Sequence, residues 1–378
     1  MKNVILVTHA TEVFGPPGAL KDYLKAKVKV LIYIFHPLDE TVKLASTAQV
    51  FQNGKLINQK RLPKFFQRFS YLGHFLGTIY FGLNFAGRQN FDYFIGANNF
   101  NCLAGIVLKR LIKIKKVVFY TVDYSPVRFK KRFSDWFYQQ FDRWALRWAD
   151  FVWSNNQRVA ALRRRQGLPD AKSLLAPNGV YLKSIPESNT AKKSAIVKFV
   201  FQGHLTKTKG TQELIKAFAA VNQRHQNWRL TIIGSGPFEK NLRQLVIRQK
   251  LNDKIKFVGW LPNQKVLEKM VKYDVGVALY NEADSYTKYC DPLKVKEYLA
   301  CGLAVLMTNV PYITNFIRQK KLGLVIKSKN QRALQQALTE IMINRKELRA
   351  WQKNARCLSK DFDWQIIFDS VFAKMETR

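Results

Sequence analysis

The sequence predicts an α/β protein with two similar domains, each built on a parallel sheet, and a ligand cleft between them. The chain has 378 residues, which suits two domains of about 150 residues each. Its hydrophobic fraction of 47% is ordinary for a globular protein and excludes a disordered or collagen-like chain. Short β-rich runs alternate with helical patterns along the whole length, as expected for strands joined by helical crossovers.

The first domain is expected to span residues 1–183. Its strands are predicted at 4–8, 28–35, 93–97, 117–122 and 151–153, with helices between most of them. Asn53-Gly54 predicts a hairpin turn, because both central positions of such a turn favour a positive φ. A helical spacing predicts a buried stripe made of Phe137, Phe141, Trp144 and Trp148.

Residues 184–194 are polar, lack periodicity and include a proline, so they are the predicted linker. A second αβ series then begins. Its strands are predicted at 198–202, 229–233, 255–258, 275–278 and 304–307, within a domain that spans 195–360. The remaining residues, 361–378, are predicted to form a C-terminal helix.

Charge is the unusual feature of the composition. The 63 basic and 26 acidic residues give a net charge of +37, spread evenly over both halves, which predicts a negatively charged partner. The four cysteines form no C-x-x-C pair, which argues against a zinc site or a disulfide framework and indicates a reducing cytoplasm. The longest apolar stretch, 71–85, is shorter than the ~20 residues that a membrane span needs.

The most informative motif covers residues 291–302. Asp291 is expected to cap a short helix, Pro292 suits its first position, and Gly302 can end it. Lys294 and Glu297 then lie one turn apart near the positive end of the helix. An ammonium there suits a phosphate and a carboxylate suits the hydroxyls of a ribose. A surface ion pair between the two is the alternative.

Two glycine-containing turns follow predicted strands. The first runs from Gly203 to Gly210, where Lys207 and Lys209 can neutralise a diphosphate, although an ordinary basic turn remains the alternative. Thr211 is expected to cap the helix that follows it. The second turn contains Gly234 and Gly236, and it predicts either a tight turn or a nucleobase contact.

In this order the motifs resemble the nucleotide-binding half of a large family, the GT-B-fold glycosyltransferases of group 4, also called glycosyl transferases group 1. Phe257-Val258-Gly259 adds to the match, as does 176–180, which resembles the end of that family's first domain. Phe362-Asp363-Trp364 resembles the start of its last helix. The resemblance implies two Rossmann-like domains that face a cleft, with the C-terminal helix crossing back to the N-terminal domain.

The resemblance also implies roles for single residues. Lys209 would bind the donor diphosphate with help from Lys294, Glu297 would bind the ribose, and the Gly234 loop would lie near the base. The implied donor-binding set is Gly203, His204, Lys207, Lys209, Gly234, Gly236, Tyr289, Asp291, Lys294 and Glu297. Tyr289 stands where the family often has a Glu near the transferred sugar, and His204 stands where it commonly has an Arg.

Two features of the first domain are candidates for the acceptor side. Asp123 follows a predicted strand and is the candidate for acceptor binding or proton handling, with loop capping as the alternative. The segment from Gly15 to Gly18 is similar to the family's glycine loop near donor and acceptor. Asp361-Phe362-Asp363 matches a metal-binding D-x-D, but its place before a terminal helix favours capping, so no metal and no cofactor are expected.

The sequence therefore predicts a glycosyltransferase that moves a sugar from a nucleotide diphosphate donor to a lipid-linked saccharide, and the resemblance implies that it retains the anomeric configuration and needs no metal. We expect it at the inner face of a bacterial-type membrane, because cations alternate with aromatic side chains around Arg61, Lys64 and Arg68. Two rivals remain: a catalytically silent subunit that steadies a partner transferase, and a basic nucleic-acid-binding protein, which the even charge and the absence of a recognition motif disfavour.

Overall fold

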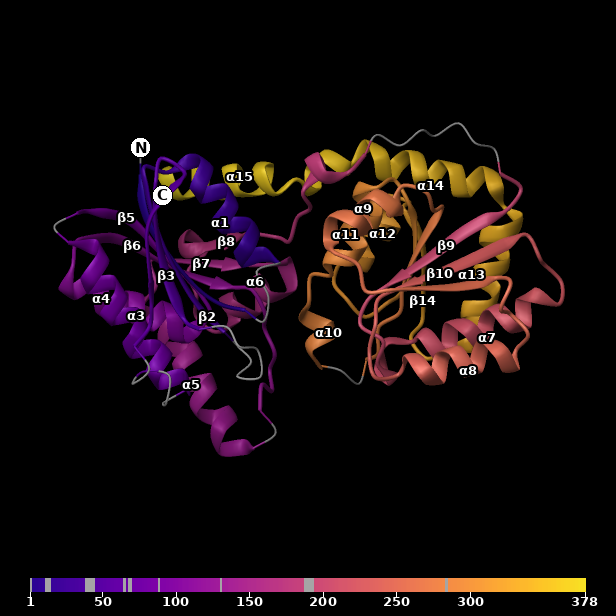
Figure 1. Cartoon of the computed structure of the whole chain (residues 1–378), viewed down its shortest axis with the longest axis horizontal. Helices are drawn as coiled ribbons and strands as arrows, with labels where there is room; N and C mark the ends of the chain where they lie inside the picture. The colour runs from indigo at the N-terminus through magenta and orange to yellow at the C-terminus, as the bar shows by residue number, and fades with distance from the viewer. Residues whose placement is uncertain are drawn as a thin grey trace. The chain divides into compact units, whose positions relative to one another are not determined.

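The computed structural model describes every residue of the chain except 1, 11–14, 38–44, 64–65, 67–69, 88, 130, 187–193 and 283–284 (Figure 1). The chain folds into two compact units. Unit 1 comprises Met1–Pro177 and Ile367–Arg378, and unit 2 comprises Asn178–Ile366. Most of the expected linker, 187–193, lies outside the described residues.

Unit 1 is built on an eight-stranded sheet with the order β4-β3-β2-β1-β5-β6-β7-β8. The strands are β1 (Asn3–Ala10), β2 (Val30–Pro37), β3 (Thr47–Gln52), β4 (Lys55–Arg61), β5 (Phe91–Ala97), β6 (Ile114–Thr121), β7 (Phe151–Ser154) and β8 (Ser173–Leu175). All neighbours pair in parallel except β2–β3 and β3–β4. The predicted hairpin is confirmed, with φ of 48° at Asn53 and 80° at Gly54.

The longer helices of unit 1 are α1 (Pro16–Lys27), α3 (Ser70–Ala86), α4 (Asn99–Leu111), α5 (Arg132–Trp148), α6 (Gln157–Arg165) and α15 (Trp364–Glu376). α3, α4 and α5 contribute Phe81, Leu108 and Leu146 to one core with the sheet. α15 begins in unit 2 and belongs to unit 1 from Ile367 onward. There its Phe372 ring lies 5.7 Å from the Tyr23 ring of α1.

The buried aromatic stripe predicted on α5 is wrong for three of its four residues, while the fourth, Phe141, is half-buried and packs against the core of unit 1. Phe137, Trp144 and Trp148 are 42%, 45% and 53% exposed. α5 instead packs inward through Ala145 and Leu146, while its Asp142 forms a buried ion pair with Arg163 of α6. A side chain as small as Ala145 lets α5 approach closely, and the large rings are left on the outer side of the helix.

Unit 2 is built on a six-stranded, fully parallel sheet with the order β11-β10-β9-β12-β13-β14. Its strands are β9 (Val197–Gln202), β10 (Trp228–Ile233), β11 (Ile255–Gly259), β12 (Val275–Ala278), β13 (Ala304–Thr308) and β14 (Gly323–Ile326). The five strands predicted for this half are confirmed. The chain order reverses at β9, between β10 and β12, which is where ligands bind in open α/β sheets.

The α-helices of unit 2 connect these strands. They are α7 (Thr211–Asn222), α8 (Glu239–Arg248), α9 (Asn263–Met270), α10 (Ser285–Tyr289), α11 (Leu293–Ala300), α12 (Thr314–Gln319), α13 (Gln331–Ile343) and α14 (Arg345–Cys357). Side chains of α7 and α13, such as Phe218 and Leu338, share a core with Phe199 of β9. Tyr298 of α11 packs into a second core with Val200, on the other side of β9.

Candidate functional site

Two glycine turns meet at the carboxyl ends of β9 and β10. Gly203 follows β9 with a φ of 148°, and Gly234 follows β10 with a φ of 132°. The N–H of Gly203 donates to the carbonyl of Ile233, and a Cβ on Gly234 would lie only 2.1 Å from the oxygen of Gly203. Glycine is therefore needed at 234, because any side chain would push the two turns apart. The backbone of both turns lies open to an approaching ligand.

The start of α11 differs from the prediction by one residue. Pro292 is its N-cap, and Asp291 does not cap the helix. The Asp291 carboxylate instead accepts hydrogen bonds from Lys296 Nζ at 2.5 Å and from the N–H of Asn178 at 2.7 Å. All three residues are buried. The charge of Asp291 is thus balanced by Lys296, and its carboxylate holds residue 178 next to the start of α11. The predicted contact of Asp291 with a donor stays a prediction. Gly302 ends the helix as expected, where the N–H of Leu303 donates to the carbonyl of Tyr298.

The predicted cap of α7 is also wrong. Gly210, in the left-handed region at a φ of 75°, is its N-cap, and Thr211 is already the first helical residue. The Thr211 hydroxyl is buried without a hydrogen-bond partner among the described residues. The helix begins one residue earlier than expected because glycine adopts this conformation without strain.

Glu297 lies buried on the inner side of α11, 6% exposed, and is held from two directions. Gln202 Nε2 donates to one carboxylate oxygen at 3.0 Å, and Asn263 Nδ2 donates to the other at 2.7 Å. Burial raises the pKa of Glu297, while these two hydrogen bonds and the Lys294 charge oppose that rise. Each oxygen keeps a free lone pair, so the carboxylate is fixed in orientation and can still accept from a ligand.

Lys294 lies beside the first glycine turn. A Cβ built on Gly203 would lie 3.2 Å from its Nζ, and its ammonium faces the rings of Phe201 and Tyr280 at 5.1 and 5.3 Å. Burial, the largest cause, and the nearby Lys209 charge together lower the pKa of Lys294 to about 8. Within the described part of the chain Lys294 forms no ion pair with Glu297 or any other carboxylate, so the surface ion pair considered from the sequence is not formed.

The other residues predicted to bind the donor differ in their exposure to solvent. Lys209 ends a short 3₁₀ turn, Lys207–Lys209, and is half-buried, whereas Lys207 and His204 are exposed. Tyr289 is the half-buried last residue of α10. A cavity of about 410 Å³ adjoins the turn at the carboxyl ends of β12, β13 and β14; its lining includes Lys207, Gly210, Tyr280, Thr308, Ser328 and Lys329.

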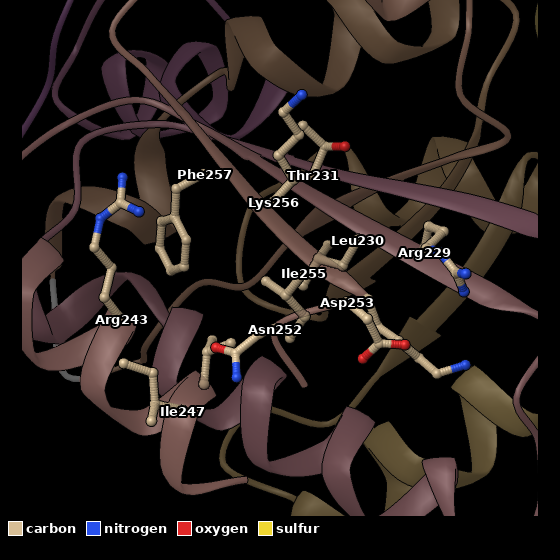
Figure 2. Close-up of a pocket in the computed structure, with 12 residues that line it drawn as sticks. Arg229, Leu230, Thr231, Arg243, Ile247, Asn252, Asp253, Ile255, Lys256 and Phe257 are labelled. Atoms are coloured by element: carbon tan, nitrogen blue, oxygen red, sulfur yellow. The ribbon is translucent and has the colours of Figure 1, made fainter. Parts of the chain in front are cut away.

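A second depression of unit 2, larger in volume than this cavity, lies elsewhere. It has a volume of about 660 Å³ and runs between α8 and the edge strand β11 (Figure 2). Figure 2 shows Arg243 beside Phe257; the guanidinium lies 4.5 Å from the ring and also pairs with Glu239 at 2.7 Å. Asn252 and Asp253, which precede β11, line it as well, so this depression reaches toward the amino end of that strand. Its lining contains neither glycine turn.

In unit 1, Asp123 lines a small pocket of about 70 Å³ at the carboxyl ends of β1, β5 and β6. The same pocket contains His9, Asn98, Arg128 and Tyr138. Burial, the largest cause, raises the pKa of Tyr138 to about 12. The structure therefore brings Asp123 together with a phenol, a guanidinium and an imidazole, a grouping suited to binding hydroxyls.

The hydrogen bonds around His9 were not predicted from the sequence. Asn98 caps α4 by accepting from the N–H of Asn101 at 2.8 Å, which turns its amide nitrogen toward His9 Nδ1, 3.0 Å away. The His9 proton is therefore on Nε2, which lies 3.1 Å from His74 Nδ1. Burial lowers the pKa of His9 to about 3. A neutral His9 with both nitrogens engaged shapes the pocket and is not available as a base.

The remaining predicted features of unit 1 have different outcomes. Pro16, Pro17 and Gly18 form the first turn of α1, and Gly15 is its N-cap, so the expected glycine loop is largely helix. Proline at the first helical positions explains this, because its fixed φ suits them. Arg61 ends β4 and is exposed, whereas Lys64 and Arg68 lie outside the described residues.

Comparison with known proteins agrees with the geometry of unit 2. Residues 184–357 match the family model of glycosyl transferases group 1. This segment, which is a little under half of the chain, is thus similar to the glycosyl transferases group 1 family. The matched segment holds both glycine turns, Lys294 and Glu297, so the parts that the sequence singled out for a nucleotide lie within the group 1 region.

Relatives over a longer stretch are distant. WcaL of Escherichia coli (strain K12), whose name assigns it to colanic acid biosynthesis as a glycosyltransferase, is 23% identical over 252 residues, which is 66% of this chain. The chain spans 61% of the length of that relative. Sucrose-phosphate synthase from Thermosynechococcus elongatus has a TM-score of 0.72 at 16% identity, with both chains covered completely.

A second solved structure, Anabaena Alr3699/HepE in complex with UDP and glucose, has a TM-score of 0.70 at 14% identity, again with complete coverage. These likenesses show that the chain has the GT-B fold, as the sequence predicts. Within the described residues, no helix is both long and apolar enough to cross a membrane, and no cluster of three potential metal ligands occurs.

Proposed function

We propose that the chain is a glycosyltransferase that transfers a hexosyl group from a nucleoside diphosphate sugar, held by unit 2, to a saccharide acceptor. The observation that carries the proposal is the oriented Glu297 carboxylate, which lies on the same helix as Lys294, beside two glycine turns at the switch point of the sheet. The similarity of residues 184–357 to a glycosyltransferase family supports it.

The chemistry of a nucleoside diphosphate matches these groups one by one. Two vicinal ribose hydroxyls can donate to the free lone pairs of Glu297, and the buried Gln202 Oε1, which has no partner among the described residues, can accept another hydrogen bond. The negatively charged diphosphate can pair with the ammonium groups of Lys294 and Lys209. When the sugar leaves, the same two ammonium groups stabilise the departing diphosphate, and this is how the site lowers the barrier.

We further propose a lipid-linked acceptor, retention of the anomeric configuration and transfer without a metal ion, at the cytoplasmic membrane face. The name of WcaL supports a role in cell-surface polysaccharide synthesis. Asp123 serves on the acceptor side in this proposal, because its pocket gathers groups that bind hydroxyls. A second candidate function is that of a GT-B subunit that binds nucleotide without transferring sugar. It is favoured by Tyr289 and His204, which stand where the family commonly has Glu and Arg.

The test is a thermal-shift screen of the purified chain with UDP, GDP, ADP and their sugars. A ligand at 100 times its Kd stabilises the folded protein by about 2.7 kcal/mol, so the correct nucleotide raises the melting temperature measurably. Glu297→Ala removes a charged acceptor, and such hydrogen bonds contribute about 1.5–3 kcal/mol each, so affinity should fall at least tenfold.

The matched control is Glu268→Ala, which removes an exposed carboxylate from α9 in the same unit. It should bind nucleotide like the wild type. Equal affinity of the folded Glu297→Ala protein and the control would reject the donor site. The release of nucleoside diphosphate from the sugar donor is then measured. Release indicates the transferase, and binding without release indicates the silent subunit.

A further inference from the structure

The outer side of α5 carries an aromatic face, which we define as Phe133, Trp136, Phe137, Trp144 and Trp148. These side chains are 71%, 55%, 42%, 45% and 53% exposed. Their rings form one chain along the helix: Phe133 lies 4.7 Å from Phe137, and Trp144 lies 6.2 Å from Trp148. Half-buried Phe141 joins the two halves, 6.4 Å from Phe137 and 5.4 Å from Trp144. The face follows all 17 residues of α5, a length of about 25 Å.

A continuous apolar face of this kind marks an interaction surface on a water-soluble domain. The neighbouring helices extend the apolar character. In unit 1, α4 packs against α5 and α3 packs against α4, and these two helices expose further large aliphatic side chains, namely Leu72, Leu76, Leu83 and Leu111. Packing within the chain does not account for these residues, because the inward contacts of α5 are made by Ala145 and Leu146.

The charges on α5 decide what kind of partner fits. Arg132, Arg143 and Arg147 are exposed along the helix. The two acids of α5 are both engaged: Asp135 accepts from the N–H groups of Arg128 and Phe129 at 2.6 and 3.0 Å, and Asp142 is buried against Arg163. Among the described residues none of these three arginines pairs with a carboxylate, so the aromatic face is bordered by positive charge that an anionic partner can neutralise.

We propose that the aromatic face of α5 docks unit 1 on the surface of an anionic lipid bilayer, with the helix lying flat in the headgroup region. Tryptophan rings favour that region, because one side of the ring meets acyl chains and the N–H meets water. The arginines would pair with lipid phosphates. A second copy of the chain fits less well, since a two-fold contact would bring arginines of both copies together.

This inference deepens the proposed lipid-linked acceptor, and it can be tested without donor or acceptor. The full chain is mixed with vesicles of phosphatidylcholine and phosphatidylglycerol in equal parts, or of phosphatidylcholine alone, and sedimented. Acyl chains brominated near the headgroup report insertion by quenching tryptophan fluorescence. We expect binding to the anionic vesicles, weakened by salt, together with quenching, and much weaker binding to the neutral ones.

Two variants and two matched controls locate the contact. The triple change Trp136→Ser, Trp144→Ser, Trp148→Ser should reduce binding at least tenfold and abolish most of the quenching. Trp260→Ser, which removes a tryptophan that is 64% exposed in unit 2, should change neither. Arg143→Glu with Arg147→Glu should also reduce binding at least tenfold, whereas Arg332→Glu with Arg349→Glu, an exposed pair in unit 2, should leave most of it intact.

Unchanged vesicle binding by the triple variant would overturn the proposal and shift attention to another surface, such as the basic segment near Arg61. Self-association of the wild type in sedimentation velocity, abolished by the same triple change, would assign the aromatic face to a second copy and would equally overturn it. The nucleotide-induced thermal shift is measured in every variant. The melting transition in this measurement shows whether each variant is folded. The presence or absence of the nucleotide-induced shift tests the donor site independently of lipid binding.

Discussion

Lys294 is the residue whose charge the proposed function needs most, and its pKa of about 8 makes that charge sensitive to pH. Below pH 8 the ammonium form dominates and attracts a diphosphate. Above pH 8 the proton is lost, so nucleotide affinity should fall as the pH rises from 7 to 9, by up to tenfold per pH unit. Calorimetric titration of the nucleotide across this range measures the effect.

The control for this titration is Lys294→Arg, because a guanidinium stays charged throughout the range. Its nucleotide affinity should be nearly independent of pH between 7 and 9. An equal decline in the wild type and in Lys294→Arg would show that another group titrates and that Lys294 does not contact the diphosphate.

At the scale of single residues, the sequence could identify Lys294 and Glu297 because their spacing on a short helix and the family motif both point to them. It could not show that Asp291 is held by both Lys296 and Asn178. The second of these contacts joins residues that are 113 positions apart in the sequence. Gln202 and Asn263, which orient Glu297, carried only a weak signal: Gln202 is the last residue of β9 and Asn263 is the first residue of α9.

At the scale of elements, the two glycine turns give the sharpest prediction. Gly234→Ala places a Cβ 2.1 Å from the Gly203 oxygen, in addition to the strain of a positive φ. Gly259→Ala has the same kind of strain at a φ of 79°, but its Cβ would meet nothing within 4 Å. Gly234→Ala should therefore lower the free energy of unfolding by clearly more than Gly259→Ala, for which about 1 kcal/mol is expected.

Chemical denaturation of the two variants makes this comparison, and nucleotide affinity is measured beside it. We expect Gly234→Ala to lose nucleotide binding as well, because the turns that form one wall of the site move apart. Equal destabilisation by the two substitutions would mean that the turns can separate without cost, and that the close approach of Gly203 and Gly234 does not shape the site.

The elements themselves followed from periodicity and turn chemistry, with two instructive exceptions. β8 and β14 were not predicted: β8 has only three residues, too few for a recognisable alternation, and β14 is a half-buried edge strand of four residues. On α5 the helical spacing of aromatic residues was read correctly as one face, but spacing cannot tell an inner face from an outer one. The side that packs is set by Ala145, Leu146 and the ion pair of Asp142, which depends on Arg163 in another helix.

At the scale of the whole molecule, the GT-B fold could be predicted from the order of several motifs rather than from any single one. Each glycine turn is ambiguous alone, yet parallel strands bring the carboxyl ends of β9 and β10 to one edge, where the turns pack against each other. The depression at the edge strand β11 could not be foreseen, and it competes with the glycine turns as the place where a nucleotide binds.

Hydrogen–deuterium exchange of the full chain, with and without the nucleoside diphosphate found in the screen, compares these two places directly. Our account predicts that bound nucleotide protects the backbone amides of 203–211, 234–236 and 293–302. Protection confined to 229–231 and 252–257, the lining of the depression in Figure 2, would contradict the account, and so would a bound nucleotide that leaves the exchange of 203–211 and 293–302 unchanged.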